Sequence, residues 1–246
     1  MKAIALTDRG MVRPNNEDTV YCSVQQVGEL PNLFVVADGM GGEQAGDEAS
    51  RLAVSELIRQ IEADKRSNAV DVLRHAISNI NLIIYMEACS KEEMTGMGTT
   101  LVSAVIDHGT LYIANIGDSR LYLIRDSIRQ LTHDHSYVEE MVSRGRMLKG
   151  SDDYKKNRNI LTRALGTQQK ITADFFDEEL KAGDRILLCT DGLTNLLEDE
   201  EIFTVIRYTS SLQDAAERLV KMANDHGGTD NISVVLIDYD GSEEPS

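Results

Sequence analysis

The order in which strand-like and helix-like segments follow one another constrains the fold of this chain more than any other feature. Short apolar runs bounded by Asp, Gly, Pro or Asn are typical of strands, and longer stretches with apolar residues at spacings of three and four are typical of helices. The expected strands are residues 3–6, 20–24, 33–37, 99–106, 111–116, 120–125, 128–131, 185–190 and 232–239, and the expected helices are residues 47–64, 69–89, 199–208 and 212–226. Because strands adjoin strands and helices adjoin helices, the sequence favours an α+β layered domain over a doubly wound parallel sheet.

The rest of the sequence predicts one continuous domain. The chain has 246 residues and three prolines, with neither an internal repeat nor a linker rich in Pro, Gly or Ser. We therefore expect a single domain over residues 1–240 and a disordered polar tail at residues 241–246. A polar region of residues 134–162 has no clear periodicity and is expected to be irregular.

Composition excludes several classes of protein. The chain carries 41 Asp plus Glu against 25 Lys plus Arg, a formal net charge of −16, and such a surface repels the phosphate backbone of nucleic acids. Three cysteines in no metal-ligand spacing fit a reducing compartment, and no apolar run approaches the roughly 18 residues of a membrane span. Asp8 interrupts the N-terminus before a signal-peptide core could form. We expect a cytoplasmic protein that binds neither nucleic acid nor membrane.

Acidic residues recur at the edges of the apolar strand-like runs, usually with Gly or Asn beside them. These positions are Glu17, Asp18, Asp38, Asp118, Asp191 and Asp230. Each Asp taken alone is typical of a turn. Strand ends of one sheet can lie side by side, however, and several carboxylates gathered there would repel one another unless cations compensated them. Oxygen ligands without His or Cys suit Mg²⁺ or Mn²⁺ and not Zn²⁺, and a carboxylate shared by two such ions is the usual framework of two-metal hydrolysis.

Six short motifs in a fixed order carry a family resemblance. They are Arg13–Asp18, Asp38–Gly42, Gly96–Thr100, Gly117–Arg120, Thr190–Leu193 and Asp230–Ile232. Each motif alone is weak, but the six together, from about Thr7 to Asp238, resemble the metal-dependent protein phosphatases of the 2C type, most of all the compact bacterial members that oppose Ser/Thr kinases. The resemblance implies two central antiparallel β-sheets packed as a sandwich and flanked by helix layers. It also implies hydrolysis of phosphoserine and phosphothreonine on proteins.

The same resemblance implies a centre of two Mn²⁺ or Mg²⁺ ions at one end of the sandwich. By motif, Asp38 bridges both ions and the carbonyl of Gly39 contacts one of them. Asp191 and Asp230 hold the other ion. A hydroxide that bridges the two ions would attack phosphorus directly, with no phosphoenzyme.

Further positions complete the site that the resemblance implies. Glu17 and Asp18 contact the ions directly or through water, and Arg13 grips two oxygens of the substrate phosphate. Asp118 belongs to a third and weaker metal site in similar bacterial enzymes, although it also fits a simple turn residue. Many eukaryotic relatives have a histidine after the Asp-Gly pair, a candidate general acid. This chain has Met40 there, so the leaving-group proton must come from another source.

The implied partners are phosphoproteins, namely the substrates of a Ser/Thr kinase and the kinase itself, and a monomer is the default state. Residues 134–165 correspond to a flap beside the metal site in similar enzymes, and within them residues 144–163 hold seven Lys or Arg against two Asp. This charge is either that of an ordinary solvated loop or attracts phosphorylated segments that the acidic body would repel. His133 and His135 are expected in capping or surface roles.

Alternative functions fit the sequence less well. A cysteine-dependent tyrosine phosphatase needs Arg six residues after its nucleophile, but Gly28, Thr95 and Asn195 stand at those positions. The sequence contains no P-loop and no Gly-x-Ser-x-Gly elbow, and the glycines after Asp38 do not complete a dinucleotide-binding pattern. The alternative from another class is a catalytically inactive relative that serves as a binding module. Such relatives typically lose the bridging acids, which are present here.

Overall fold

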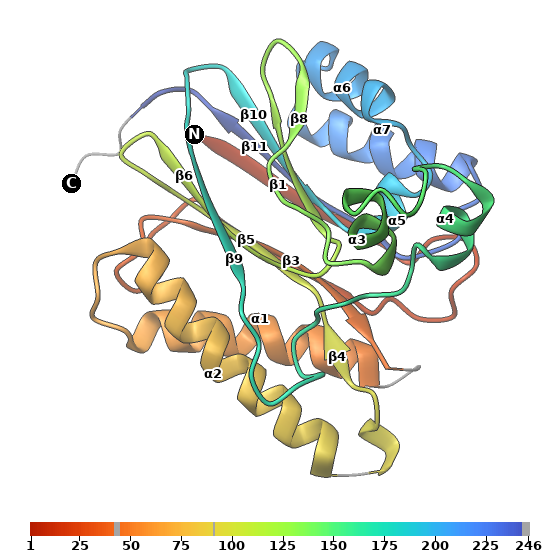
Figure 1. Cartoon of the computed structure of the whole chain (residues 1–246). Helices are drawn as coiled ribbons and strands as arrows, with labels where there is room; N and C mark the ends of the chain where they lie inside the picture. The colour runs from red at the N-terminus through yellow and green to blue at the C-terminus, as the bar shows by residue number, and fades with distance from the viewer. Residues whose placement is uncertain (42–44, 91, 243–246) are drawn as a thin grey trace.

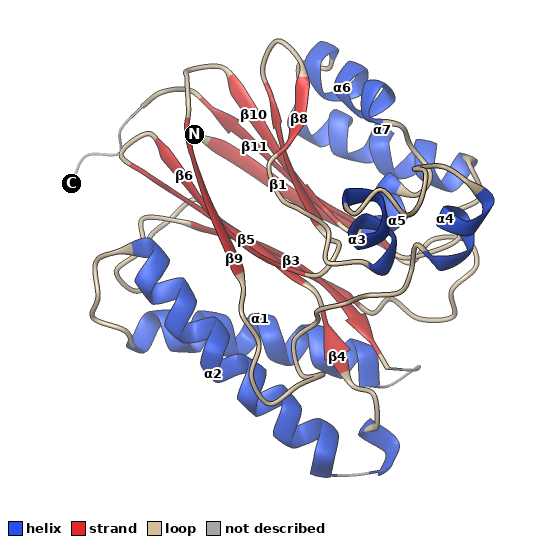
Figure 2. Ribbon diagram, viewed as in Figure 1, coloured by secondary structure: helices blue, strands red, loops and turns tan. Residues whose placement is uncertain are grey.

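Two antiparallel sheets lie face to face in this protein, with helices on both outer faces (Figures 1 and 2). The structure, a computed structural model, describes residues 1–41, 45–90 and 92–242. The strands are β1 Lys2–Asp8, β2 Asp18–Ser23, β3 Leu33–Met40, β4 Gly98–Thr99, β5 Leu101–Asp107, β6 Thr110–Ile116, β7 Arg120–Ile124, β8 Ile128–Gln130, β9 Asp174–Glu179, β10 Asp184–Cys189 and β11 Ile232–Tyr239. One sheet has the order β1-β11-β10-β7-β8 and the other the order β2-β3-β5-β6-β9, with β4 paired to β3. The expected α+β sandwich is confirmed.

Two pairs of helices cover the outer faces of the sheets. The described helices are α1 Ala45–Ala63, α2 Ala69–Ser90, the 3₁₀ helix η1 Glu92–Met94, α3 Tyr137–Ser143, α4 Asp152–Asn157, α5 Asp191–Thr194, α6 Asp199–Tyr208 and α7 Leu212–Asp225. The long pair α1 and α2 packs on the sheet that contains β3 and β5, and the pair α6 and α7 packs on the sheet that contains β10 and β11 (Figure 1). The shorter α3, α4 and α5 gather at one end of the sandwich (Figure 2).

Apolar side chains fill one layer between the sheets and one layer between each sheet and its helices. In β3, Leu33 and Val35 face the α1 and α2 layer, whereas Phe34 and Val36 face the other sheet, as the two-residue period of a strand requires. A strand buried on both faces reads as a continuous apolar run. This burial is why the central strands could be recognised from the sequence.

Several short elements, among them η1 and α5, differ from the sequence prediction. Residues 134–162, expected to be irregular, contain α3 and α4, whose N-termini are capped by the side chains of Ser136 and Ser151. These helices have 7 and 6 residues, too few for an apolar period to reveal them. Strand β9 was missed because four of the six residues in its sequence, Asp-Phe-Phe-Asp-Glu-Glu, are acidic. It lies at the edge of its sheet, paired with β6, where polar side chains are tolerated.

Some of the sequence expectations fall outside the described residues. Gly42, the last residue of the second motif, is one, and residues 243–246 of the expected tail are others. The first part of that tail is described, and the backbone N–H of Ser242 donates to Asp240 Oδ1 at 3.0 Å. Across the described ranges, none of the helices is both long enough and apolar enough to span a bilayer.

Candidate active site

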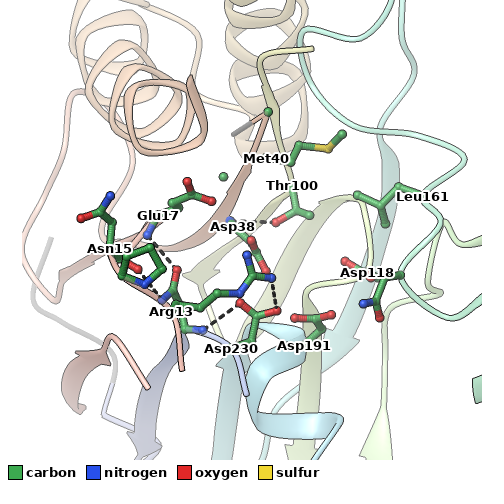
Figure 3. Close-up of a pocket in the computed structure, with 15 residues that line it drawn as sticks. Arg13, Asn15, Glu17, Asp38, Met40, Thr100, Asp118, Leu161, Asp191 and Asp230 are labelled. Atoms are coloured by element: carbon green, nitrogen blue, oxygen red, sulfur yellow. Dashed lines mark hydrogen bonds and ion pairs between the residues drawn. The ribbon is translucent and has the colours of Figure 1, made fainter. Parts of the chain in front are cut away.

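A cavity of about 490 Å³ opens at the end of the sandwich where the acidic motifs meet (Figure 3). It is lined by seven of the eight residues expected at the site, Arg13, Glu17, Asp38, Gly39, Asp118, Asp191 and Asp230. Figure 3 shows Glu17 and Asp118 on opposite sides of the cavity, with Asp38, Asp191 and Asp230 between them. The eighth residue, Asp18, is buried beside this group and does not line the cavity.

Strand pairing brings these acids together from distant parts of the sequence. Asp38 lies near the end of β3, directly opposite Asp18 on β2. Strand β10 ends just before Asp191, and β11 begins just after Asp230. Because β10 and β11 are antiparallel neighbours, the end of one lies beside the start of the other. Asp118 sits in the turn that carries the chain from β6 in one sheet to β7 in the other.

Two glycines allow the backbone to pack closely around the acids. A Cβ atom on Gly39 would lie 2.0 Å from the carbonyl oxygen of Gly46, and one on Gly192 would lie 1.9 Å from the carbonyl oxygen of Asn231. Both distances are far below a van der Waals contact, so a side chain at either position would force the segments apart. The glycine after Asp38 and the glycine after Asp191 are therefore required by the tertiary contacts around the acids.

Four carboxyl groups of the site lie where burial and neighbouring charges disfavour their ionised form. Burial raises the pKa of Asp18 to about 7 and that of Asp191 to about 6, and neighbouring carboxylates add to the effect. Burial and the surrounding acids also raise the pKa of Asp38 and of Asp118 well above the ordinary range for Asp. Carboxylates held this close in a poorly solvated place destabilise one another unless a cation compensates them.

The donor set fits hard divalent cations. The acids offer oxygen ligands, which Mg²⁺ and Mn²⁺ prefer, and Asp18 Oδ1 is buried without a hydrogen-bond partner in the described part of the chain. Within that part, no three His, Cys, Asp or Glu side chains are already arranged as ligands around one metal position. Instead, Asp191 Oδ2 accepts a hydrogen bond from Asn195 Nδ2 at 2.8 Å and Asp230 Oδ2 accepts one from Arg13. These carboxylates could exchange protein donors for a cation.

Arg13 lies at the edge of the cavity with nearly half of its side chain exposed. Its Nη2 donates to Asp230 Oδ2 at 2.8 Å. Partial burial disfavours the charge on Arg13, but the carboxylates of Asp230 and Glu17 outweigh this effect and raise its pKa. The guanidinium therefore stays charged and lies close enough to the acids to contact an anion bound among them.

Sequence reasoning quoted Asn231 and Thr100 within motifs but gave neither a role. Asn231 fastens the loop that carries Arg13. Its Oδ1 accepts from the backbone N–H of Glu17 at 2.8 Å, and its Nδ2 donates to the carbonyls of Arg9 at 2.8 Å and of Asn15 at 2.9 Å. The only sequence signal for this function was the Asp-Asn pair that closes the last motif.

Thr100 connects two of the acidic segments. Its Oγ1 accepts a hydrogen bond from the backbone N–H of Asp38 at 2.9 Å and shares another with Ser119 Oγ at 2.7 Å. Asn159 and Leu161 of the expected flap also line the cavity, as does Met40. The Gly-Thr-Thr motif signalled Thr100, whereas Asn159 and Leu161 had no signal beyond their place in the flap.

Comparison with known proteins gives a consistent picture. A family model described as Protein phosphatase 2C matches residues 8–232. The serine/threonine phosphatase Stp of Listeria monocytogenes is 38% identical over 245 residues, which cover 98% of this chain and 96% of the relative.

Solved structures agree with the sequence comparison. The serine/threonine phosphatase Stp1 from Staphylococcus aureus superposes with a TM-score of 0.90 at 35% identity, covering 98% of this chain and 95% of that one. The catalytic domain of the phosphatase PstP in complex with two manganese ions superposes with a TM-score of 0.83 at 33% identity, covering 96% of this chain and 97% of that one. With its acidic cavity at the end of a matching sandwich, this chain belongs to the protein phosphatase 2C family.

Proposed function

We propose that this enzyme, a protein serine/threonine phosphatase of the 2C type, hydrolyses phosphoserine and phosphothreonine with the help of two Mn²⁺ or Mg²⁺ ions in the acidic cavity. One observation carries the proposal: Asp38, Asp118 and Asp191 converge on one cavity, and their pKa values stay raised although the cationic side chains of Arg13, Arg120 and Arg158 lie nearby. The two manganese ions named for the PstP structure support the choice of metal.

The residues of the cavity divide between two ions. Asp38 would bridge them, with the carbonyl of Gly39 on one ion and Asp191 with Asp230 on the other. When bound, two such ions lower the pKa of a water molecule and so supply a hydroxide nucleophile near neutral pH. Asp38 is suited to the bridging position because it lies between the other carboxyls in the cavity (Figure 3).

Three more acids take supporting roles in this proposal. Glu17 lines the cavity on the side of the loop before β2, and Asp18 lies buried next to it, so they would hold the ions directly or through water. Asp118, on the opposite side, would hold a third and weaker ion.

Arg13 would bind the substrate. It is already beside the acids and carries a charge that does not titrate, so it can exchange the carboxylate of Asp230 for two oxygens of a phosphate group. Met40 also lines the cavity, and its thioether has no proton to give. The proton that the leaving serine or threonine needs therefore comes from a source other than this side chain.

Several finer features stay predictions. They are a single phosphatase domain over residues 1–240 with a flap at 134–165, a monomeric state, a cytoplasmic location, and a Ser/Thr kinase together with its substrates as partners. The inactive binding module has no observation in its favour, because each acid that the family resemblance implies is present at the cavity or buried beside it.

A metal-dependence assay tests the proposed function. We expect hydrolysis of a phosphothreonine peptide to require Mn²⁺ or Mg²⁺ and to stop with a chelator. Asp38→Ala should abolish turnover because it removes the shared ligand, while thermal unfolding shows that the fold survives. Asp126→Ala, at an exposed turn between β7 and β8, is the matched control and should retain activity. Full activity in metal-free buffer, or in Asp38→Ala, would contradict the proposal.

A further inference from the structure

His135 is a buried residue that holds a backbone turn of the active site. A capping or surface role was expected for it, and the surface alternative is wrong, since His135 is 5% exposed whereas its neighbour His133 is exposed. The backbone N–H of His135 donates to the carbonyl of Gly117 at 2.9 Å, and the N–H of Gly117 donates to His135 Nδ1 at 3.1 Å. Both backbone groups of Gly117 are therefore bound by one residue.

These contacts fix the form of the imidazole. An amide N–H can only donate, so Nδ1 carries no proton and Nε2 carries one. Nε2 then donates to Asp174 Oδ2, 3.0 Å away. Burial, together with the charge of Arg163, lowers the pKa of His135 despite the nearby Asp174, which agrees with a neutral ring. The ring is thus oriented by a partner on each nitrogen.

The turn that His135 holds is the one that presents Asp118 to the cavity. Gly117 has a φ of 102°, and a Cβ atom there would lie 2.5 Å from Thr100 Cγ2, so the turn is wedged between Thr100 and the imidazole. Ser119 follows Asp118 in the chain, and its Oγ forms a hydrogen bond with Thr100 Oγ1. Little freedom is left for the backbone of Asp118 as long as the imidazole stays in place.

The other side of the imidazole leads to the flap. Asp174 Oδ1 accepts from Arg163 Nη1 at 2.8 Å, and the N–H of Thr162 donates to the carbonyl of His135 at 2.8 Å. Residues 162 and 163 directly follow Leu161, which lines the cavity. A second cavity, of about 480 Å³, lies behind this network and is lined by His135 and Asp174 among others.

We propose that His135 is a positioning residue of the phosphatase. It fixes the backbone position of Asp118 through its hydrogen bonds to Gly117. Through Asp174 and Arg163, it also couples the position of Asp118 to the position of the flap residues that line the cavity. The inference rests on the proposed function, in which Asp118 serves the reaction. It assigns no proton transfer to His135, because the ring lies behind the turn and does not line the active-site cavity.

Two substitutions separate the two halves of this link. The Oδ1 of an asparagine lies about where Nδ1 lies in histidine, so His135→Asn should keep the acceptor for Gly117 and lose the bond to Asp174. The longer side chain in His135→Gln reaches Asp174 but provides no acceptor at the Nδ1 position. The backbone hydrogen bond from residue 135 to Gly117 remains in both. His133→Gln, in the same second cavity and exposed, is the matched control.

We expect His135→Gln to lower kcat on a phosphopeptide about tenfold with KM within about twofold of wild type, because the substrate-binding Arg13 is untouched. His135→Asn should stay within about threefold of wild type in kcat, and His133→Gln should match wild type. In the Asp118→Asn background, the additional loss from His135→Gln should disappear, because His135 acts through Asp118. A loss that persists in that background, or wild-type kcat in His135→Gln, would overturn the proposal.

Hydrogen exchange of the metal-free protein gives a readout that does not depend on activity. The amide of Gly117 should exchange faster in His135→Gln, whereas amides of residues 159–163 should exchange faster in His135→Asn. Unchanged exchange at Gly117 in His135→Gln would refute the positioning role even in an inactive preparation. Failure of the proposed function would appear separately, as wild-type protein without metal-dependent hydrolysis.

Discussion

Replacing the charge of Asp18 should stabilise the metal-free protein. The side chain is 7% exposed, and Thr190 Oγ1 donates to its Oδ2 at 3.0 Å. Its Oδ1 has no hydrogen-bond partner among the described residues. Burial, with smaller contributions from Asp191 and Asp230, raises its pKa from 3.8 to about 7. Asp18→Asn removes the charge and keeps the shape of the side chain.

The sign of the effect follows from the direction of the pKa shift. A carboxyl with a higher pKa in the folded state destabilises that state once the pH exceeds the unfolded pKa, and the loss grows until the pH passes the folded pKa. Relative to wild type, Asp18→Asn should therefore gain stability as the pH rises from 3.8 to about 7. Between pH 5 and pH 8, only the two pH units from 5 to about 7 contribute, because above its folded pKa Asp18 is ionised in both states. At about 1.36 kcal/mol per unit, the gain in the free energy of unfolding between pH 5 and pH 8 should be about 2.7 kcal/mol.

Urea unfolding in the presence of a chelator, at pH 5 and at pH 8, measures this gain. The amide nitrogen placed at the Oδ1 position lacks an acceptor and costs roughly 1–3 kcal/mol at both pH values, so the informative quantity is the change between them. Asp126→Asn, at an exposed position, is the control and should show no such change. A difference between Asp18→Asn and wild type that is the same at both pH values would refute the account of a desolvated, repelled carboxylate.

Two further predictions concern the substrate, the first measured with the phosphopeptide assay and the second with phosphoproteins and a small aryl phosphate. Arg13→Ala should raise KM about tenfold, and Arg13→Lys should restore it only in part, because an ammonium group cannot hold two phosphate oxygens in one plane; unchanged kinetics in both variants would place Arg13 outside the substrate site. Replacing the exposed Lys155 and Lys156 of α4 by Glu should slow hydrolysis of phosphoproteins, spare a small aryl phosphate, and lose its effect as salt rises. Equal losses on both substrates would instead indicate a misfolded flap, and Arg158 is left in place because its Nη1 is 3.5 Å from the carbonyl oxygen of Asn195.

The long helices and the central strands could be predicted because their signals are local. The apolar stripes of α1 and α2 repeat over 19 and 22 residues, enough to fix a helical period. The continuous apolar runs of β3 and β10 reflect burial on both faces. Short capped helices and an acidic edge strand have no such pattern, which is why α3, α4 and β9 were not foreseen.

The sequence by itself determined which acids belong to the candidate site and their order along the chain, because the six motifs stand at strand ends and each is complete within a few residues. Their convergence on one cavity follows from the pairing of β2 with β3 and of β10 with β11, a long-range property that local patterns do not contain. Tertiary structure alone decided that Asp18 lies buried beside the cavity and that His135 is buried behind Asp118. It also decided that Asn231 fastens the loop of Arg13. Each of these contacts joins segments far apart in the chain, and their distances and desolvation exist only once both sheets have packed.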